Sequence, residues 1–198
     1  MEKENVARFV ACLSRFEERT FHFSKDLSEK VEGQFAKAVL LYIGYNSLKN
    51  STILQGIASG ISKLEISSKD CEKTLGDTGK IISYLSEEIS KTKKVNDKEL
   101  GSLADKMLMV CTITLAQLRT LSLMASKISE WYNVDLQNLQ GVFELLTRDD
   151  EINIELLTKL QRLFLQKEEK TDNMTQAPEV RYQKPENWNT PTHWNKIR

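Results

Sequence analysis

The chain has 198 residues, a length that suits one domain, and its 28 basic and 28 acidic side chains leave no formal net charge. A chain without net charge has no long-range electrostatic attraction to nucleic acid or to anionic lipid, so we expect neither as a partner. The start is charged and no apolar run approaches the roughly 18 residues of a membrane span, which predicts a cytoplasmic protein.

Two long helices are predicted first, because apolar or small residues recur at alternating spacings of three and four, the pattern of one helix face. Between residues 4 and 31 this face carries Val6, Val10, Leu13, Thr20, Ser24, Leu27 and Val31. Between residues 32 and 63 it carries Ala36, Val39, Leu40, Ile43, Leu54, Ile57 and Ile61. Polar residues interrupt both faces, namely Glu17 in the first and the pair Ser47 and Asn50 in the second.

A longer connection follows at residues 64–96, where we expect two shorter helices, one within SSKDCEKTL and one over about residues 79–91. Ile81, Ile82, Leu85 and Ile89 form the apolar face of the latter.

Two further long helices are predicted over residues 98–131 and 135–167. Asn96, followed three residues later by Glu99, is the expected N-cap pair of the first, and Asp135 is the expected N-cap of the second. The inward positions of the first are Leu100, Leu103, Met107, Val110, Leu118, Leu121, Ala125 and Ile128, interrupted by Cys111 and Thr114. Those of the second are Leu139, Val142, Leu146, Leu157, Leu160 and Phe164, interrupted by Asp150 and Asn153.

After Lys170 the helical pattern stops. Residues 171–198 are polar and proline-punctuated, so we expect an extended or disordered tail after a helical domain of residues 1–170. Its aromatic residues, Tyr182, Trp188 and Trp194, are candidates for docking on a partner or on the protein's own helices.

The predicted architecture is an all-α four-helix bundle. Each long segment of about 30 residues spans about 45 Å, and such equal lengths suit a bundle. The short links predict two antiparallel hairpins, and the long helical crossover lets the second and third long helices run parallel.

The reactive side chains do not predict a nucleophilic enzyme. Cys12, Cys71 and Cys111 are odd in number and far apart, which predicts reduced thiols rather than a disulfide or a zinc site. His22 belongs to the outer face of its helix and His193 to the tail, so neither is placed as a base beside Cys111 or Ser47.

The polar residues on the inward faces all fall near the middle of their helices, so packing predicts a single buried polar layer. Its members are Glu17, Ser47, Asn50, Cys111, Thr114, Asp150 and Asn153. Burying a polar group without a partner costs roughly 1 to 3 kcal/mol, so these groups must bond one another, water or a ligand.

Three segments resemble the ferritin-like superfamily, and most of all its rubrerythrin-type members. RFEERTFHFSKDLSEKVE is similar to the first-helix signature of that family, YNSLKNSTILQGIASG to its second helix, and RDDEINIELLTKLQRLF to its fourth. The resemblance spans about residues 4–167 and implies a bundle that holds two metal ions. Their ligands are one Glu on each of two helices and a Glu-x-x-His pair on each of the others.

The ligand positions depart from that pattern. Ser47 and Asn50 replace one Glu-x-x-His pair, Asp150 and Asn153 replace the other, and Cys111 or Thr114 lies where the third-helix Glu belongs. Only Glu17 matches outright, and Asp150 is a shortened match. The resemblance therefore implies a degenerate centre with no metal or other cofactor.

The sequence thus favours a non-enzymatic scaffold or protein-interaction module, acting through a protein partner or self-association. One alternative is a rubrerythrin-like oxidoreductase or metal store with an atypical oxygen-only site for iron or manganese around Glu17 and Asp150. Another is a binder of a peptide or small ligand that uses the polar layer as its pocket.

Overall fold

The computed structural model describes residues 2–63, 65–132 and 136–175, and within them it contains seven α-helices and no β-strand. The helices are α1 (Glu2–Lys30), α2 (Gln34–Ile61), α3 (Ser68–Leu75), α4 (Asp77–Ser90), α5 (Asp97–Leu123), α6 (Ala125–Tyr132) and α7 (Leu136–Thr175). The all-α class predicted from the sequence is confirmed.

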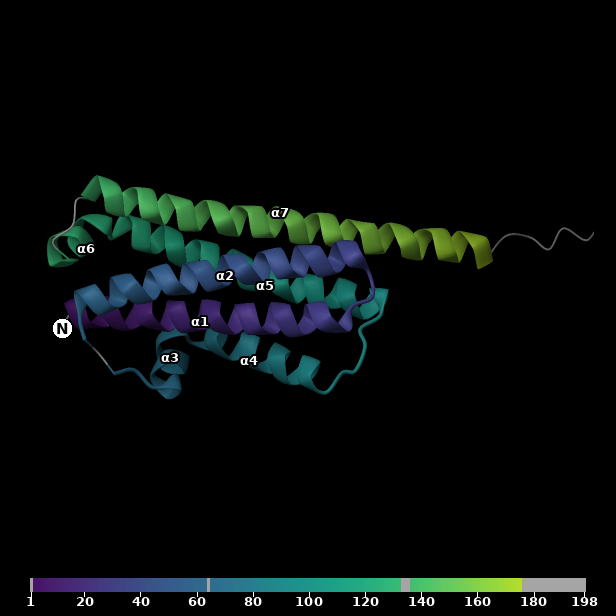
Figure 1. The fold of residues 1–198 in the computed structure, drawn as a ribbon, viewed down its shortest axis with the longest axis horizontal. Coiled ribbons are helices and arrows are strands. Elements are labelled where there is room, and N and C mark those ends of the chain that lie inside the picture. The colour runs from purple at the N-terminus through teal and green to yellow at the C-terminus, as the bar shows by residue number, and fades with distance from the viewer. Residues whose placement is uncertain (1, 64, 133–135, 176–198) are drawn as a thin grey trace, which may run out of the picture.

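The four long helices α1, α2, α5 and α7 lie side by side (Figure 1). A short turn joins α1 to α2, which run antiparallel, and α5 and α7 form the second antiparallel pair. The α3–α4 segment packs along α1 and carries the chain to the opposite end of the bundle before α5 begins. As a result α2 and α5 run in the same direction, as the long crossover predicts.

The crossover is linked to α1 by a disulfide between Cys12 and Cys71, whose Cα atoms are 5.0 Å apart. The expectation of reduced thiols at these two positions is therefore wrong. No local sequence pattern predicts this disulfide, since the two cysteines are 59 residues apart and only the packing of α3 on α1 brings them together. Cys111, by contrast, is a free and buried cysteine.

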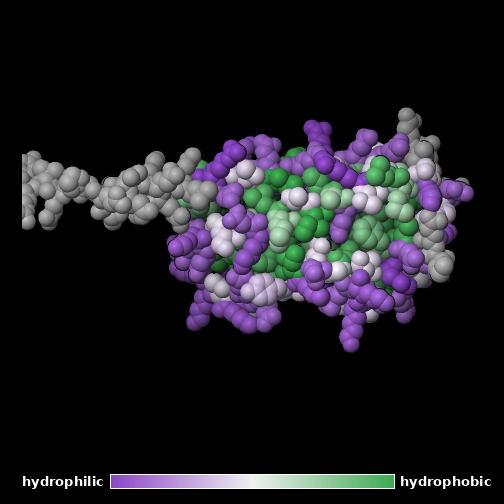
Figure 2. Space-filling view, turned by 180° about the vertical axis from the view of Figure 1, so that it is seen from behind, coloured by the Kyte–Doolittle hydropathy of each residue, from purple (hydrophilic) through white to green (hydrophobic). Residues whose placement is uncertain are grey.

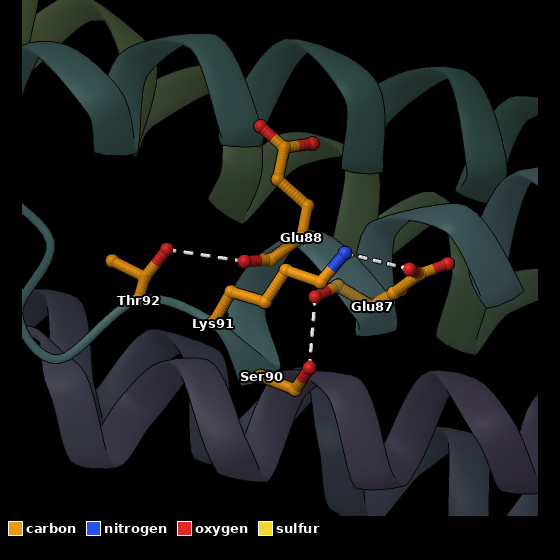
Figure 3. A network of polar contacts seen from close by, with 5 residues as sticks. All are labelled: Glu87, Glu88, Ser90, Lys91 and Thr92. Atoms are coloured by element: carbon orange, nitrogen blue, oxygen red, sulfur yellow. Dashed lines mark hydrogen bonds and ion pairs between the residues drawn. The ribbon is translucent and has the colours of Figure 1, made fainter.

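Hydrogen bonds within the last turn define the end of α4 (Figure 3). The Ser90 hydroxyl donates to the Glu87 carbonyl oxygen at 2.8 Å, and the Thr92 hydroxyl donates to the Glu88 carbonyl oxygen at 3.1 Å. Lys91 Nζ lies 2.7 Å from Glu87 Oε1. These bonds satisfy carbonyl groups that the end of a helix leaves without partners.

Beyond α4 the chain meets the turn between α1 and α2. Val95 N donates to Lys30 O at 3.0 Å in an isolated parallel bridge between Val31 and Val95, and Lys30 Nζ donates to Ile89 O. This contact fixes the point at which α5 starts. There Asn96 and Glu99 form the predicted reciprocal cap, in which each side chain accepts from the other's backbone N–H.

The third long helix differs from the prediction, because it breaks at Met124 into α5 and α6. The two parts meet at 62°. Among the described residues no single helix is both long and apolar enough to cross a membrane, and α5 and α6 reach that threshold only when they are taken together.

The fourth long helix, α7, continues to Thr175, past its expected end at Lys167 and into the predicted tail. Its last turns extend beyond the other helices (Figure 1). The expected N-cap Asp135 lies outside the described residues, as do the tail residues Tyr182, Trp188, His193 and Trp194.

The core follows the predicted helix faces, and their apolar positions are buried with two exceptions, one of which is the half-buried Ile81 of α4. Val142 is only half-buried, and its neighbour Phe143 is fully buried in its place. Close contact between α1 and α2 depends on small residues. A Cβ atom on Gly44 would lie 3.3 Å from Ser24 Cβ, so an alanine there would require a small shift of α1 or α2.

Candidate functional site

The predicted polar layer is present in the middle of the bundle, and each of the four long helices contributes to it. Its residues are Glu17 on α1, Ser47 and Asn50 on α2, Cys111 on α5, and Asp150 and Asn153 on α7, and all of these are buried. We call this set the central layer. Glu17 interacts with Ser47 and Asn50, and its charge acts on both Asp150 and Cys111.

Amide groups connect α2 to α7 across the layer. Asn46 Nδ2 donates to Asn153 Oδ1 at 3.0 Å. With its amide nitrogen turned toward α7, Asn50 donates to Asp149 Oδ2 at 3.2 Å and to the carbonyl oxygen of Asn46 at 3.3 Å. Lys49 Nζ lies 2.7 Å from Asp149 Oδ2, so this carboxylate already has a cationic partner.

The two inner carboxyl groups hold their protons unusually tightly. Burial raises the pKa of Glu17 to about 7, although a hydrogen bond with Ser47 opposes the rise. Burial also raises the pKa of Asp150 well above its ordinary value, and the charge of Glu17 adds to that effect. Asp150 therefore favours the neutral form in the folded protein, and Glu17 is only partly ionised near neutral pH, which limits the negative charge of the layer.

Three polar atoms of the layer have no hydrogen-bond partner among the protein atoms, namely Glu17 Oε1, Asp150 Oδ2 and Asn153 Nδ2. Two are carboxyl oxygens and one is an amide donor, so the set offers both acceptors and a donor. Buried groups of this kind ordinarily bond a water molecule or a ligand.

The remaining layer positions offer little chemistry. Burial and the charges of Asp150 and Glu17 raise the pKa of the Cys111 thiol well above its usual range, so it remains protonated and is a weak nucleophile. Thr114 is buried, but its hydroxyl donates to Val110 O of its own helix at 3.0 Å rather than to the layer. His22 is exposed, as its position on the outer helix face predicts.

The layer does not fit a two-metal centre of the ferritin-like type. Such a centre uses about four carboxylates and two imidazoles, whereas Glu17 and Asp150 are the only layer carboxyls without a lysine partner in the described part of the chain. Across the described residues no group of three or more His, Cys, Asp and Glu side chains is placed to hold a metal ion.

Asp149, Lys49 and Asn46 belong to the same network but were not predicted from the sequence. Each of the three residues is adjacent in sequence to a predicted member of the central layer. Such positions lie at the edge of the inward helix face, where the helical period alone does not predict whether a side chain is buried. The sequence offered one signal for this network, which is opposite charge. Lys49 lies beside the predicted layer residue Asn50, and Asp149 lies beside Asp150, so an ion pair between α2 and α7 could have been considered.

A second feature is an apolar cavity at the end of the bundle where α1 turns into α2 and where α5 begins. Its volume is about 710 Å³. We call it the end cavity. Its apolar walls come from all of these segments and from α7, and comprise Val31, Phe35, Ala36, Val95, Leu100, Leu160, Leu163 and Phe164.

A third feature is an exposed stripe along α5, formed by Met109, Thr112, Ala116, Thr120 and Leu123, which we call the α5 stripe. Residues 107–118 of this helix include no charged side chain. The hydroxyls of Thr112 and Thr120 donate to carbonyl oxygens of their own helix, which leaves their methyl groups at the surface. Figure 2 shows the side of the bundle that faces away from the viewer in Figure 1, with hydrophobic residues gathered between hydrophilic margins.

Comparison of the chain with protein-family models, with curated proteins and with solved structures gives no match.

Proposed function

We propose that the protein is a non-enzymatic helical bundle of ferritin-like type that has lost its metal centre and acts as a scaffold, through self-association or a protein partner. The observation that carries this proposal is the composition of the central layer. Where metal-binding relatives would have imidazoles and bridging carboxylates, this chain has Ser47, Asn50, Cys111 and Asn153.

The chemistry of those replacements supports a structural role. Amide and hydroxyl groups hydrogen-bond one another without adding charge, and the Asn46–Asn153 and Asn50–Asp149 bonds join α2 to α7. A neutral amide is a poor substitute for imidazole as a ligand of iron or manganese, and it cannot offset the charge of a dication. The layer then specifies how the two helix pairs fit together.

The α5 stripe supports self-association. Its residues are arranged symmetrically about Ala116, with Thr112 and Thr120 four residues away on either side and Met109 and Leu123 seven residues away. Two copies packed antiparallel would place Ala116 against Ala116 and Met109 against Leu123, the isologous contact that a two-fold axis requires. Residues 107–118 bring no charge to this contact, and the zero net charge of the chain favours association.

A second candidate is a protein that holds one metal ion at an oxygen-only site. The unpartnered oxygens Glu17 Oε1 and Asp150 Oδ2 favour it, since a cation could satisfy both and replace their protons. Iron or manganese bound there would supply redox chemistry or storage, and Glu17 and Asp150 would be its protein ligands.

Metal analysis of the intact protein, purified from iron-rich and from manganese-rich medium, separates the two candidates. The scaffold proposal predicts far less than one ion per chain in both preparations. One tightly held ion per chain that is lost in Glu17→Ala, but retained in the exposed control Glu18→Ala, would establish the second candidate instead. Two ions per chain would contradict the ligand count on which both rest.

A further inference from the structure

The end cavity leaves large apolar side chains in contact with solvent. Phe35 on α2 is 54% exposed and Leu163 on α7 is 44% exposed, and both line the cavity. A volume of about 710 Å³ lies within the range of pockets that bind organic ligands, roughly 300 to 1,000 Å³. Covering these walls with another apolar group would remove their surface from water.

The rim of the cavity is acidic. Glu32, Asp97 and Glu99 line it together with one basic residue, Lys94, which pairs with Glu32 at 2.8 Å. An occupant that combines aromatic groups with positive charge would therefore complement both the walls and the rim.

The part of the chain that follows α7 has this composition. Residues 176–198 contain Tyr182, Trp188 and Trp194 together with four basic and two acidic residues. The segment also contains the three prolines of the chain, which reduce the conformational entropy that it loses on docking.

The same segment is long enough to reach the cavity. Phe164 lines the cavity and α7 continues to Thr175, so at 1.5 Å per residue the helix carries the chain roughly 16 Å away. An extended return over that distance takes about five residues at 3.3 Å each. Trp188 is the thirteenth residue after Thr175 and therefore reaches the cavity with chain to spare.

We propose that the segment of residues 176–198 folds back along the end of α7 and places the indole of Trp188 in the end cavity of its own chain. Its basic residues then lie against the acidic rim formed by Glu32, Asp97 and Glu99. The indole then covers apolar walls of the cavity that are otherwise exposed to solvent, such as those of Phe35 and Leu163. This inference does not depend on the metal content of the central layer.

The test uses the full chain with Trp131→Phe and Trp194→Phe, so that Trp188 is the only fluorescent indole. We expect blue-shifted emission and weak quenching by acrylamide. Leu163→Glu, which places a charge on the cavity wall at a half-exposed position, should shift the emission to that of a solvated indole and raise the quenching constant several-fold.

Leu145→Glu is the matched control, because Leu145 lies on the same helix, is 48% exposed and does not line the cavity. It should leave the emission unchanged, and circular dichroism should show both variants folded. Emission of a solvated indole in the parent protein would overturn the proposal, as would emission that Leu163→Glu does not change. Blue-shifted emission that disappears on dilution would also overturn it, since the segment would then occupy the cavity of a second copy.

Discussion

Glu17 shows how a single buried side chain links the central layer to pH. Its pKa is raised from an ordinary 4.5 to about 7, so the folded protein binds this proton more tightly than the unfolded chain does. Stability must then rise as pH falls from about 8 toward 5, and it must fall as the pH rises through the folded pKa. Asp150 acts in the same direction, because its pKa is raised as well.

We predict that Glu17→Gln removes the share of this pH dependence that Glu17 contributes, whereas the share due to the burial of Asp150 remains. The amide keeps the size of the side chain and cannot ionise, so at pH 8.5 the variant should be more stable than the parent protein by roughly 2 to 3 kcal/mol, and near pH 5 the two should be alike. Chemical denaturation at pH 5, 7 and 8.5 measures this difference.

The neighbouring substitution Glu18→Gln serves as the control, since Glu18 is exposed on the same helix. It should leave the pH profile of the parent protein unchanged. An unfolding free energy that does not vary between pH 5 and 8.5 in the parent protein would contradict the assignment of Glu17 as a buried, proton-holding carboxyl group.

Residue identity and helical period were sufficient to predict most of the central layer. Glu17, Asn50, Cys111, Asp150 and Asn153 are buried where the pattern places them. The partners of these residues were not predictable in the same way. Which amide faces which carboxyl group depends on the relative rotation of two helices, and no local pattern encodes that rotation.

At the scale of whole elements, the apolar faces and the caps were sufficient to predict the long helices. They were not sufficient to predict the break between α5 and α6. Asn96 and Glu99 cap α5 as predicted. No proline or glycine marks the break at Met124. The backbone N–H of Met124 donates to carbonyl oxygens in the last turn of α5. The inward face of the helix continues through Ala125 and Ile128, so periodicity alone indicated one continuous helix.

The disulfide fixes the crossover as an element of the bundle. It joins α3 to α1 over a sequence separation of 59 residues, in a region where α3 has only a few turns of its own to hold it in place. Disulfides persist mainly in oxidising compartments, and the cytoplasmic location expected from the sequence remains a prediction.

We predict that breaking this disulfide lowers the free energy of unfolding by about 4 kcal/mol, the loop-entropy value for a closed loop of this length. Denaturation of the parent protein with and without dithiothreitol measures the loss. The double variant Cys12→Ala, Cys71→Ala should be insensitive to the reductant. A parent protein equally stable in both conditions would show that the crossover is held by packing alone.

At the scale of the whole molecule, the end cavity and the α5 stripe are two apolar surfaces that the described residues leave exposed after folding. The two surfaces differ in shape and charge, and therefore in the kind of occupant that fits them. The cavity is concave with an acidic rim, which fits an aromatic and basic segment, whereas the stripe is uncharged and symmetric about Ala116, which fits a second copy of itself.

We predict that Ala116→Glu weakens self-association, because it places two like charges side by side at the two-fold axis. The dimer dissociation constant, measured by light scattering over a dilution series, should rise by more than about tenfold, or about 1.4 kcal/mol. Ala38→Glu introduces the same change at an exposed position of α2 and should have no effect. If the parent protein is monomeric at all concentrations, the α5 stripe is not an interface between copies.

The sequence by itself determined the all-α class, the four long helices and the burial of a polar layer at their midpoints, since these depend on helical period and on the lengths of the connections. Tertiary structure alone decided that Cys12 meets Cys71, that Asp149 pairs with Lys49 and that an open cavity lies beside Phe35 and Leu163. The physical reason is distance along the chain. A periodic pattern reports which side of a helix is buried, whereas these features depend on which residues of a distant helix are packed against that side.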